Sequence, residues 1–137
     1  MNAQGEILVI DDDRDDLFIY QSIFSDLNIP NTIKYFEYPA EVYKYLEEVP
    51  HDPFIIISDI NMPLINGFQL REKMLNNHKL RGRTSPFIYV TNTGNDLDIF
   101  RAHELFATGL HRKRDDYNSQ KALILDIVKN AEINITV

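Results

Sequence analysis

The chain contains no cysteine among its 137 residues. Without thiols it cannot form disulfides, thiolate metal sites or a cysteine nucleophile, which is consistent with a reducing compartment. Long hydrophobic runs are missing too. The apolar part of the N-terminal segment is too short for a signal peptide or a bilayer-spanning helix, and acidic residues follow it at once. The sequence therefore predicts a cytoplasmic protein with no membrane partner.

An excess of positive charge is also lacking. The chain has 14 Lys and Arg against 21 Asp and Glu, a formal net charge of -7. Because non-specific nucleic-acid binding comes largely from cations that neutralise phosphates, we expect no nucleic-acid partner. Neither a P-loop nor a Gly-rich turn follows any apolar run, which disfavours a nucleotide-binding protein. The 44% hydrophobic and 26% charged residues are typical of one globular domain, predicted to span residues 1–137.

Three short apolar runs, at residues 7–10, 54–58 and 87–90, are each followed by a polar side chain. Their length and their content of Ile and Val are typical of buried strands in a parallel sheet. Segments 32–36 and 109–113 are predicted as two further short strands. The five strands alternate with segments whose apolar residues recur at helical spacing.

The predicted helices have recognisable starts, with N-caps at Asp13, at Asn95 or Asp96 and at Ser119, and with Pro39 in a first turn. Asn66-Gly67 forms a turn before the third helix. The candidate core contacts of the five helices are Leu17, Tyr20, Ile23, Phe24, Leu27, Val42, Tyr45, Leu46, Phe68, Leu70, Met74, Leu75, Leu97, Phe100, Leu105, Phe106, Leu123, Ile124, Ile127 and Val128.

A strand-helix unit repeated five times predicts an α/β fold. Right-handed crossovers turn that order into a doubly wound, five-stranded parallel sheet of the flavodoxin-like (βα)5 type. In this topology the switch point lies between the first and third strands, where ligands bind beyond the carboxyl ends. Asp11, Asp12 and Asp59 follow those two strands. Oxygen ligands without a nearby thiol or imidazole suit a hard divalent cation, so we expect a Mg²⁺ site.

Several motifs, from Glu6 to about Lys129, resemble the receiver domain of two-component response regulators, the fold of the chemotaxis protein CheY. We therefore expect a receiver core at residues 6–129 and a C-terminal tail at 130–137. The motifs are Val9-Ile10-Asp11-Asp12-Asp13, Ile57-Ser58-Asp59-Ile60-Asn61-Met62-Pro63, Asn66-Gly67, Val90-Thr91-Asn92 and Gly109-Leu110-His111-Arg112-Lys113.

The resemblance implies a role for each site residue. Asp59 would be the phosphoacceptor, and Mg²⁺ would be held by Asp12, Asp59 and the backbone carbonyl of Asn61, with Asp11 one water further out. The phosphoryl oxygens would be bound by three groups. These are the Lys113 ammonium, the Thr91 hydroxyl and the Asn92 backbone N–H.

The resemblance also implies partners: a sensor histidine kinase or histidine phosphotransfer protein as donor, and a downstream protein target. A homodimer through the face of the fourth helix, fifth strand and fifth helix is a further expectation. Such a protein is a phosphoacceptor with slow self-catalysed dephosphorylation, not an enzyme.

Two alternatives stay open. One is a receiver-like scaffold that is not phosphorylated; the other is a phosphatase of the haloacid-dehalogenase type, whose D-x-D motif fits Asp11-Asp12-Asp13 but whose next Thr or Val is Asp15 here.

Two residues depart from the usual receiver pattern. Arg114 follows Lys113, where most receivers have a proline after a cis peptide bond. Because a cis bond before a non-proline residue costs about 2.5–4 kcal/mol, we expect the bond to be trans. Leu110 stands where the family usually has an aromatic switch residue, so output from the face near the fifth strand is expected to differ.

Overall fold

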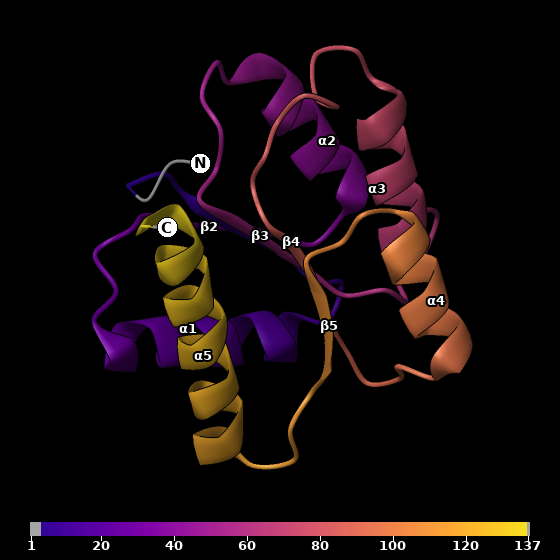
Figure 1. Ribbon diagram of the computed structural model, residues 1–137. Helices are drawn as coiled ribbons and strands as arrows, with labels where there is room; N and C mark the ends of the chain where they lie inside the picture. Colours follow the sequence, from indigo (N-terminus) through magenta and orange to yellow (C-terminus); the bar gives the residue numbers. More distant parts are fainter. Residues whose placement is uncertain (1–3, 137) are drawn as a thin grey trace.

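Strands and helices alternate along the whole chain (Figure 1), and the computed structural model describes residues 4–136. The strands are β1 (Ile7–Ile10), β2 (Ile33–Phe36), β3 (Ile55–Ser58), β4 (Phe87–Thr91) and β5 (Gly109–Arg112). The helices are α1 (Arg14–Leu27), α2 (Pro39–Glu48), α3 (Gly67–Asn76), α4 (Asp96–Glu104) and α5 (Tyr117–Thr136). No helix within residues 4–136 combines the length and hydropathy needed to cross a bilayer.

All strand pairs are parallel, and the strand order is β2-β1-β3-β4-β5. This order confirms the predicted doubly wound, flavodoxin-like sheet. The order reverses between β1 and β3, where Ile10 pairs with Phe36 on one side and with Ser58 on the other. The switch point therefore lies where the sequence analysis expects it.

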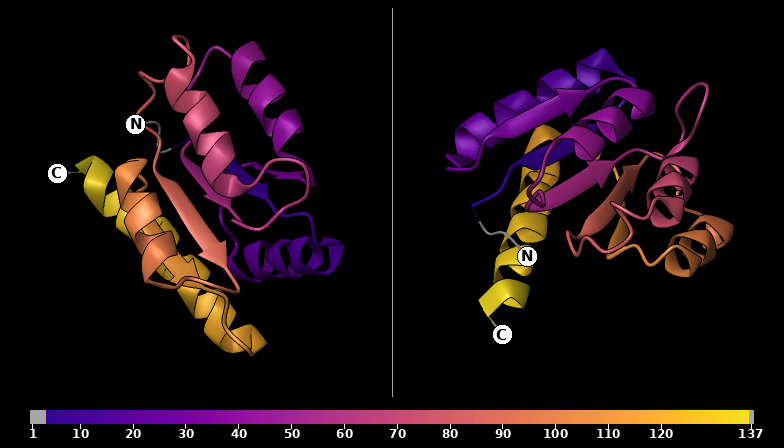
Figure 2. Two further views of the ribbon diagram at one scale, coloured as in Figure 1. Left: turned by 90° about the vertical axis from the view of Figure 1, so that its right-hand side faces the viewer. Right: turned by 90° about the horizontal axis from the view of Figure 1, so that it is seen from above.

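Alternating strand residues supply two separate hydrophobic layers. Ile7 and Val9 of β1 pack with the buried faces of α1 and α5, whereas Leu8 and Ile10 pack with α2, α3 and α4. Figure 2 shows the helices arranged on the two faces of the sheet in this way. Because side chains alternate along a strand, a run that is apolar at every position is buried on both faces. Such burial is worth about 1.5–3 kcal/mol for each large aliphatic side chain.

The predicted helix starts are mostly confirmed. The Asp13 carboxylate caps α1 by accepting hydrogen bonds from the backbone N–H groups of Asp15 and Asp16. Asn66 and Gln69 form a reciprocal capping box at α3, and Asn95 caps α4. The predicted cap at Ser119 is wrong. α5 begins at Tyr117, three residues before the start that a cap at Ser119 would give, and the Asp116 carboxylate accepts from the Ser119 N–H.

The predicted core of α4 is largely wrong. Leu97, Phe100 and Phe106 are 77%, 62% and 75% exposed, and the buried residues of this segment are Ala102 and Leu105. α4 is a short helix that packs mainly on β5, the edge strand, so it covers only a narrow strip of sheet. Apolar spacing alone could not reveal how little surface was available to the helix. The last helix differs in extent, since α5 continues past the predicted core boundary and Ala131 is buried.

Candidate functional site

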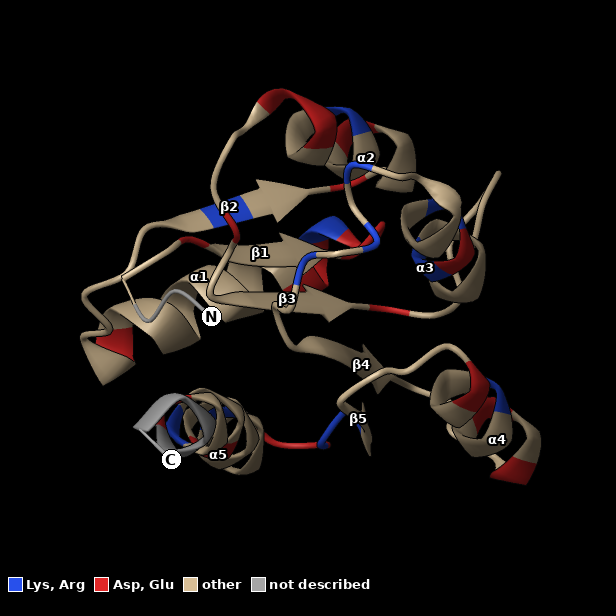
Figure 3. Cartoon of the chain, turned by 45° about the horizontal axis from the view of Figure 1, so that its top comes forward, with Lys and Arg blue, Asp and Glu red and all other residues tan. Residues whose placement is uncertain are grey.

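The acids that follow β1 and β3 are held by an extension of the strand pairing. The Asp11 backbone N–H donates to the Phe36 carbonyl at 3.0 Å, and the Asp59 N–H donates to the Ile10 carbonyl at 2.9 Å. Each ladder thus continues one residue beyond its strand and fixes the backbone of the acid. Figure 3 shows an acidic position, in red, directly after the end of β3.

Three carboxylates form the centre of the site. Asp11, Asp12 and Asp59 can each place one oxygen within 4.8 Å of the others, and Asp12 is the most exposed of the three. An all-oxygen set with a solvent-facing member suits Mg²⁺, which binds through few carboxylates and keeps several waters. The donor set therefore fits the cation that the sequence predicts.

Asp11 is the most deeply buried of these acids, at 1% exposure. One carboxylate oxygen accepts the Asp13 backbone N–H at 3.0 Å, and the other accepts the Lys113 ammonium at 2.9 Å. Burial raises the pKa of Asp11 to about 6, because loss of water disfavours the charged form more than Lys113 stabilises it. The ionised form of Asp11 is thus costly to bury, and Lys113 offsets only part of that cost.

The Asp59 side chain is tightly placed. Its Oδ1 accepts the Ile60 backbone N–H at 2.7 Å, and its Oδ2 lies 3.3 Å from the Lys113 Nζ. The start of α3 packs directly on this backbone, since a Cβ added at Gly67 would lie 2.3 Å from the Asp59 carbonyl oxygen. A glycine is therefore required at this position by close approach, in addition to its place in the turn.

Lys113 joins the acids from the end of β5. Its ammonium contacts Asp16 at 2.7 Å, Asp11 at 2.9 Å and Asp59 at 3.3 Å, and its side chain is only 9% exposed. Burial would lower the pKa of Lys113, but the surrounding carboxylates outweigh it and raise the pKa above its ordinary value. The Lys113–Arg114 peptide bond is trans, as predicted.

Two hydroxyl groups connect the end of β4 to Asn61 and to α4. Thr91 is fully buried, and its hydroxyl lies 3.4 Å from that of Thr93. The Thr93 hydroxyl accepts from the Asn61 side-chain amide at 3.2 Å and donates to Asp98 of α4 at 3.2 Å. Asn61 and Thr91 are therefore coupled to the first turn of α4 through Thr93.

The predicted site residues meet in one cavity of about 170 Å³. Asp11 lies beneath it and reaches it through its contact with Lys113. The lining residues are Asp12, Asp13, Asp16, Asp59, Asn61, Thr91, Asn92 and Lys113. The structure thus assembles every residue that the resemblance selected.

Sequence reasoning missed Asp16 and the steric role of Gly67. Asp16 lies three residues after the N-cap Asp13, so it belongs to the first turn of α1, at the same edge as the site. The spacing of Asp16 from Asp13 could have indicated a site residue, but an acid at that position is equally typical of a helix start. Gly67 was recognised as a turn residue, whereas its contact with Asp59 depends on how α3 packs.

Comparisons with known proteins agree with this geometry. The family model of the response regulator receiver domain matches residues 7–124. A probable transcriptional regulator, ycf29 of Pyropia yezoensis, is 32% identical over 74 residues, which are 54% of this chain and 32% of that protein. The match thus spans about a third of the length of that relative.

Solved structures share the fold at low sequence identity. The phosphorylated cyanobacterial phytochrome response regulator RcpA has a TM-score of 0.77 at 19% identity, over 94% of this chain and 91% of that one. The Mn(2+)-bound form of response regulator Rcp1 has a TM-score of 0.77 at 18% identity, over 90% and 91%. Since the family model covers most of its length, the chain belongs to the response regulator receiver domain family.

Proposed function

We propose that this chain is a cytoplasmic receiver that accepts a phosphoryl group on Asp59. The donor would be a histidine kinase or a histidine phosphotransfer protein, and the output would be a contact with another protein. One observation carries the proposal: the Asp59 carboxylate lies with Asp11 and Asp12 in an acidic group whose oxygens are close enough to share one cation, and it shares a cavity with Thr91 and Lys113.

Asp12, Asp59 and the Asn61 backbone carbonyl would hold Mg²⁺, with Asp11 linked through a water. When bound, the cation would neutralise charge on the transferring oxygens and leave coordination positions for one of them and for waters. The proteins of known structure that resemble this chain include one described as Mn(2+)-bound and one described as phosphorylated, which supports both parts of the proposal.

In the transfer itself, an Asp59 carboxylate oxygen forms the new bond to phosphorus while the phosphorus–nitrogen bond of the donor phosphohistidine breaks. The electron pair of that bond stays with the imidazole, which takes up a proton. Carboxylates are weak nucleophiles, so the rate depends on position and on stabilisation of the phosphoryl charge. Lys113, the Thr91 hydroxyl and the Asn92 backbone N–H would bind the phosphoryl oxygens.

The Thr91 and Thr93 hydroxyls offer a route from the site to the surface. If the Thr91 hydroxyl moved toward the phosphoryl group, it would break its contact with the Thr93 hydroxyl. Thr93 in turn contacts Asn61 and, in α4, Asp98. Leu110 of β5 lies partly buried against the core cluster near α4 and would pack inward in place of the usual aromatic residue. The output surface would therefore be the face of α4, β5 and α5.

Helix α4, which forms part of that face, exposes several large apolar side chains. Leu97, Ile99 and Phe100 of α4 are 77%, 51% and 62% exposed, on a helix next to the edge strand. Clustered apolar side chains at the surface favour a protein partner. A homodimer through this face would cover them, and a downstream target would compete for the same surface.

The decisive experiment is incubation with acetyl phosphate and Mg²⁺, followed by intact-mass measurement of the wild type and Asp59→Asn. We expect one phosphoryl group on the wild type and none on the variant. An unmodified wild type, under conditions that modify an ordinary receiver, would favour the unphosphorylated scaffold instead. The family assignment gives the haloacid-dehalogenase alternative no support, and turnover of a phosphomonoester at an enzyme-like rate would be needed to revive it.

A further inference from the structure

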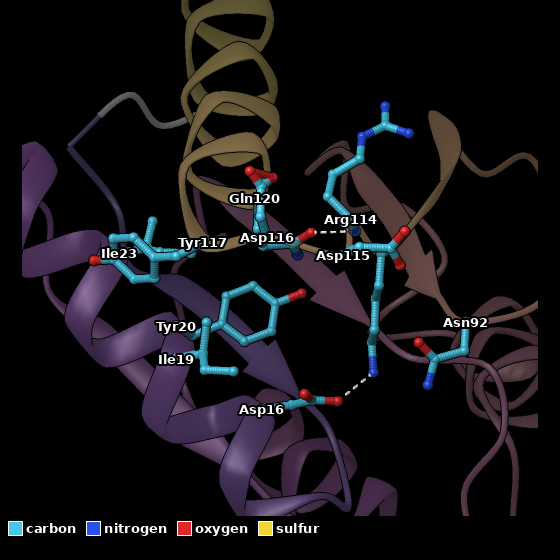
Figure 4. A pocket seen from close by; sticks show the side chains of 11 residues that line it. Asp16, Ile19, Tyr20, Ile23, Asn92, Arg114, Asp115, Asp116, Tyr117 and Gln120 are labelled. Atoms are coloured by element: carbon cyan, nitrogen blue, oxygen red, sulfur yellow. Dashed lines mark hydrogen bonds and ion pairs between the residues drawn. The ribbon is translucent and has the colours of Figure 1, made fainter.

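The Lys113 ammonium is bound by three carboxylates that differ in one respect. Asp11 and Asp59 belong to the acidic group that fits a divalent cation, whereas Asp16 lies outside that group. Asp16 also makes the shortest of the three contacts, at 2.7 Å. Figure 4 shows the Asp16 side chain reaching from α1 toward the end of β5, with the ion pair dashed.

A cation and a lysine compete for the same two carboxylates. A divalent ion bound among Asp11, Asp12 and Asp59 would neutralise part of the negative charge that attracts the Lys113 ammonium. It would also repel the ammonium directly. Phosphorylation of Asp59 would then also alter the contact between Asp59 and Lys113. Among the described partners of Lys113, Asp16 is the carboxylate that is neither part of the acidic group nor modified by phosphorylation.

Little else fixes the lysine side chain. Its backbone N–H donates to the Thr91 carbonyl at 2.8 Å, and the next N–H, that of Arg114, donates to the Gln120 side chain at 2.7 Å. These bonds hold the backbone past β5, and Figure 4 shows the second of them as a dashed line. They leave a flexible four-carbon side chain whose ordering costs up to about 2 kcal/mol. A side-chain partner must therefore select the conformation that points at Asp59.

We propose that Asp16 is a positioning residue that keeps the Lys113 ammonium beside Asp59 while the cation and the phosphoryl group engage the other carboxylates. This inference rests on the proposed function. Asp16 acts through Lys113 and does not touch the reacting atoms. The alternative is a purely structural role, because any acid in the first turn of a helix stabilises it.

Asp15 separates these two roles. It lies next to Asp16 in the same first turn of α1, is exposed, and forms none of the ion pairs within the described residues. Asp15→Asn and Asp16→Asn therefore remove the same charge from the same helix turn. Only the second variant removes a partner of Lys113.

The test measures the rate of phosphorylation by acetyl phosphate at saturating Mg²⁺. We expect Asp16→Asn to lower the rate about tenfold, equivalent to about 1.4 kcal/mol, and Asp15→Asn to change it less than about twofold. Asp16→Glu, which restores the charge, should recover part of the loss. In a Lys113→Met background, Asp16→Asn should have no more effect than Asp15→Asn, since a positioning residue needs its lysine.

A second measurement does not depend on phosphorylation. In protein with ¹³C-labelled lysine and bound Mg²⁺, relaxation of the Lys113 ε-methylene should show a mobile side chain in Asp16→Asn and a rigid one in Asp15→Asn. Equal phosphorylation rates of the two variants, or equal lysine mobility, would overturn the inference and leave the proposed function intact. A wild type that is not phosphorylated at all would overturn both.

Discussion

Removal of the Asp11 carboxylate should change how the stability of the protein depends on pH. Asp11 is 1% exposed, and burial raises its pKa from the ordinary value of 3.8 to about 6. Between these two values the folded protein keeps a proton that the unfolded chain releases. The corresponding stability is fully present below pH 3.8 and is lost as the pH rises through 6.

The size of the effect follows from the shift. About two pKa units at 1.36 kcal/mol each give a total loss of about 3 kcal/mol in the free energy of unfolding, from pH values well below 3.8 to pH values well above 6. Roughly a third of it should fall between pH 5 and pH 6. Lys113 stays charged in both states over this window, because its raised pKa lies far above it. Asparagine at position 11 does not titrate, so Asp11→Asn should lack this component.

The assay is urea unfolding followed by circular dichroism from pH 5 to pH 7.5 in EDTA, for the wild type, Asp11→Asn and the exposed-site control Asp15→Asn. We expect the wild type to lose stability relative to Asp11→Asn as the pH rises, and the control to run parallel to the wild type. Added Mg²⁺ should stabilise the wild type more at pH 7 than at pH 5, because the cation needs ionised ligands. Parallel curves for the wild type and Asp11→Asn would refute the reasoning.

Two further substitutions probe the packing of the site and the exposed face of α4. Gly67→Ala puts a Cβ 2.3 Å from the Asp59 carbonyl oxygen, so urea unfolding should show a loss of about 1–3 kcal/mol in the free energy of unfolding. Acetyl phosphate should also modify this variant more slowly than the wild type. Unchanged stability and an unchanged phosphorylation rate would contradict the contact. Phe100→Ser alters a side chain that is 62% exposed, so in protein diluted until the wild type is monomeric the unfolding free energy should change by less than about 0.5 kcal/mol. In sedimentation velocity the wild type should be dimeric and this variant monomeric, and the same state for both would contradict the homodimer.

The parts of the structure that the sequence predicted well are those decided by local pattern. A run such as Ile55-Ile56-Ile57 is apolar at every position, and only a strand buried on both faces accommodates that pattern. The acids after β1 and β3 follow such runs directly, so their meeting at the switch point could be inferred from strand order alone. The cap at Asp13 depends on a side chain and backbone two residues apart, which is also local information.

The errors lie where a distant segment decides the outcome. The apolar residues of α4 look like core positions, yet Leu97 and Phe100 are exposed because β5 is the edge strand and offers the helix little surface. Asp116 caps α5 in place of Ser119, since the course of the loop after β5 decides where that helix begins.

The sequence pattern by itself determined two things: the fold class, and the meeting of Asp11, Asp12 and Asp59 at one edge of the sheet. Tertiary structure alone decided that Asp16 contacts Lys113 and that Gly67 must lack a side chain. The physical reason is how far apart in the sequence the interacting residues lie. Residue spacing encodes burial and strand ends, whereas a contact between α1 and the end of β5, nearly 100 residues apart, exists only once the sheet has brought them together.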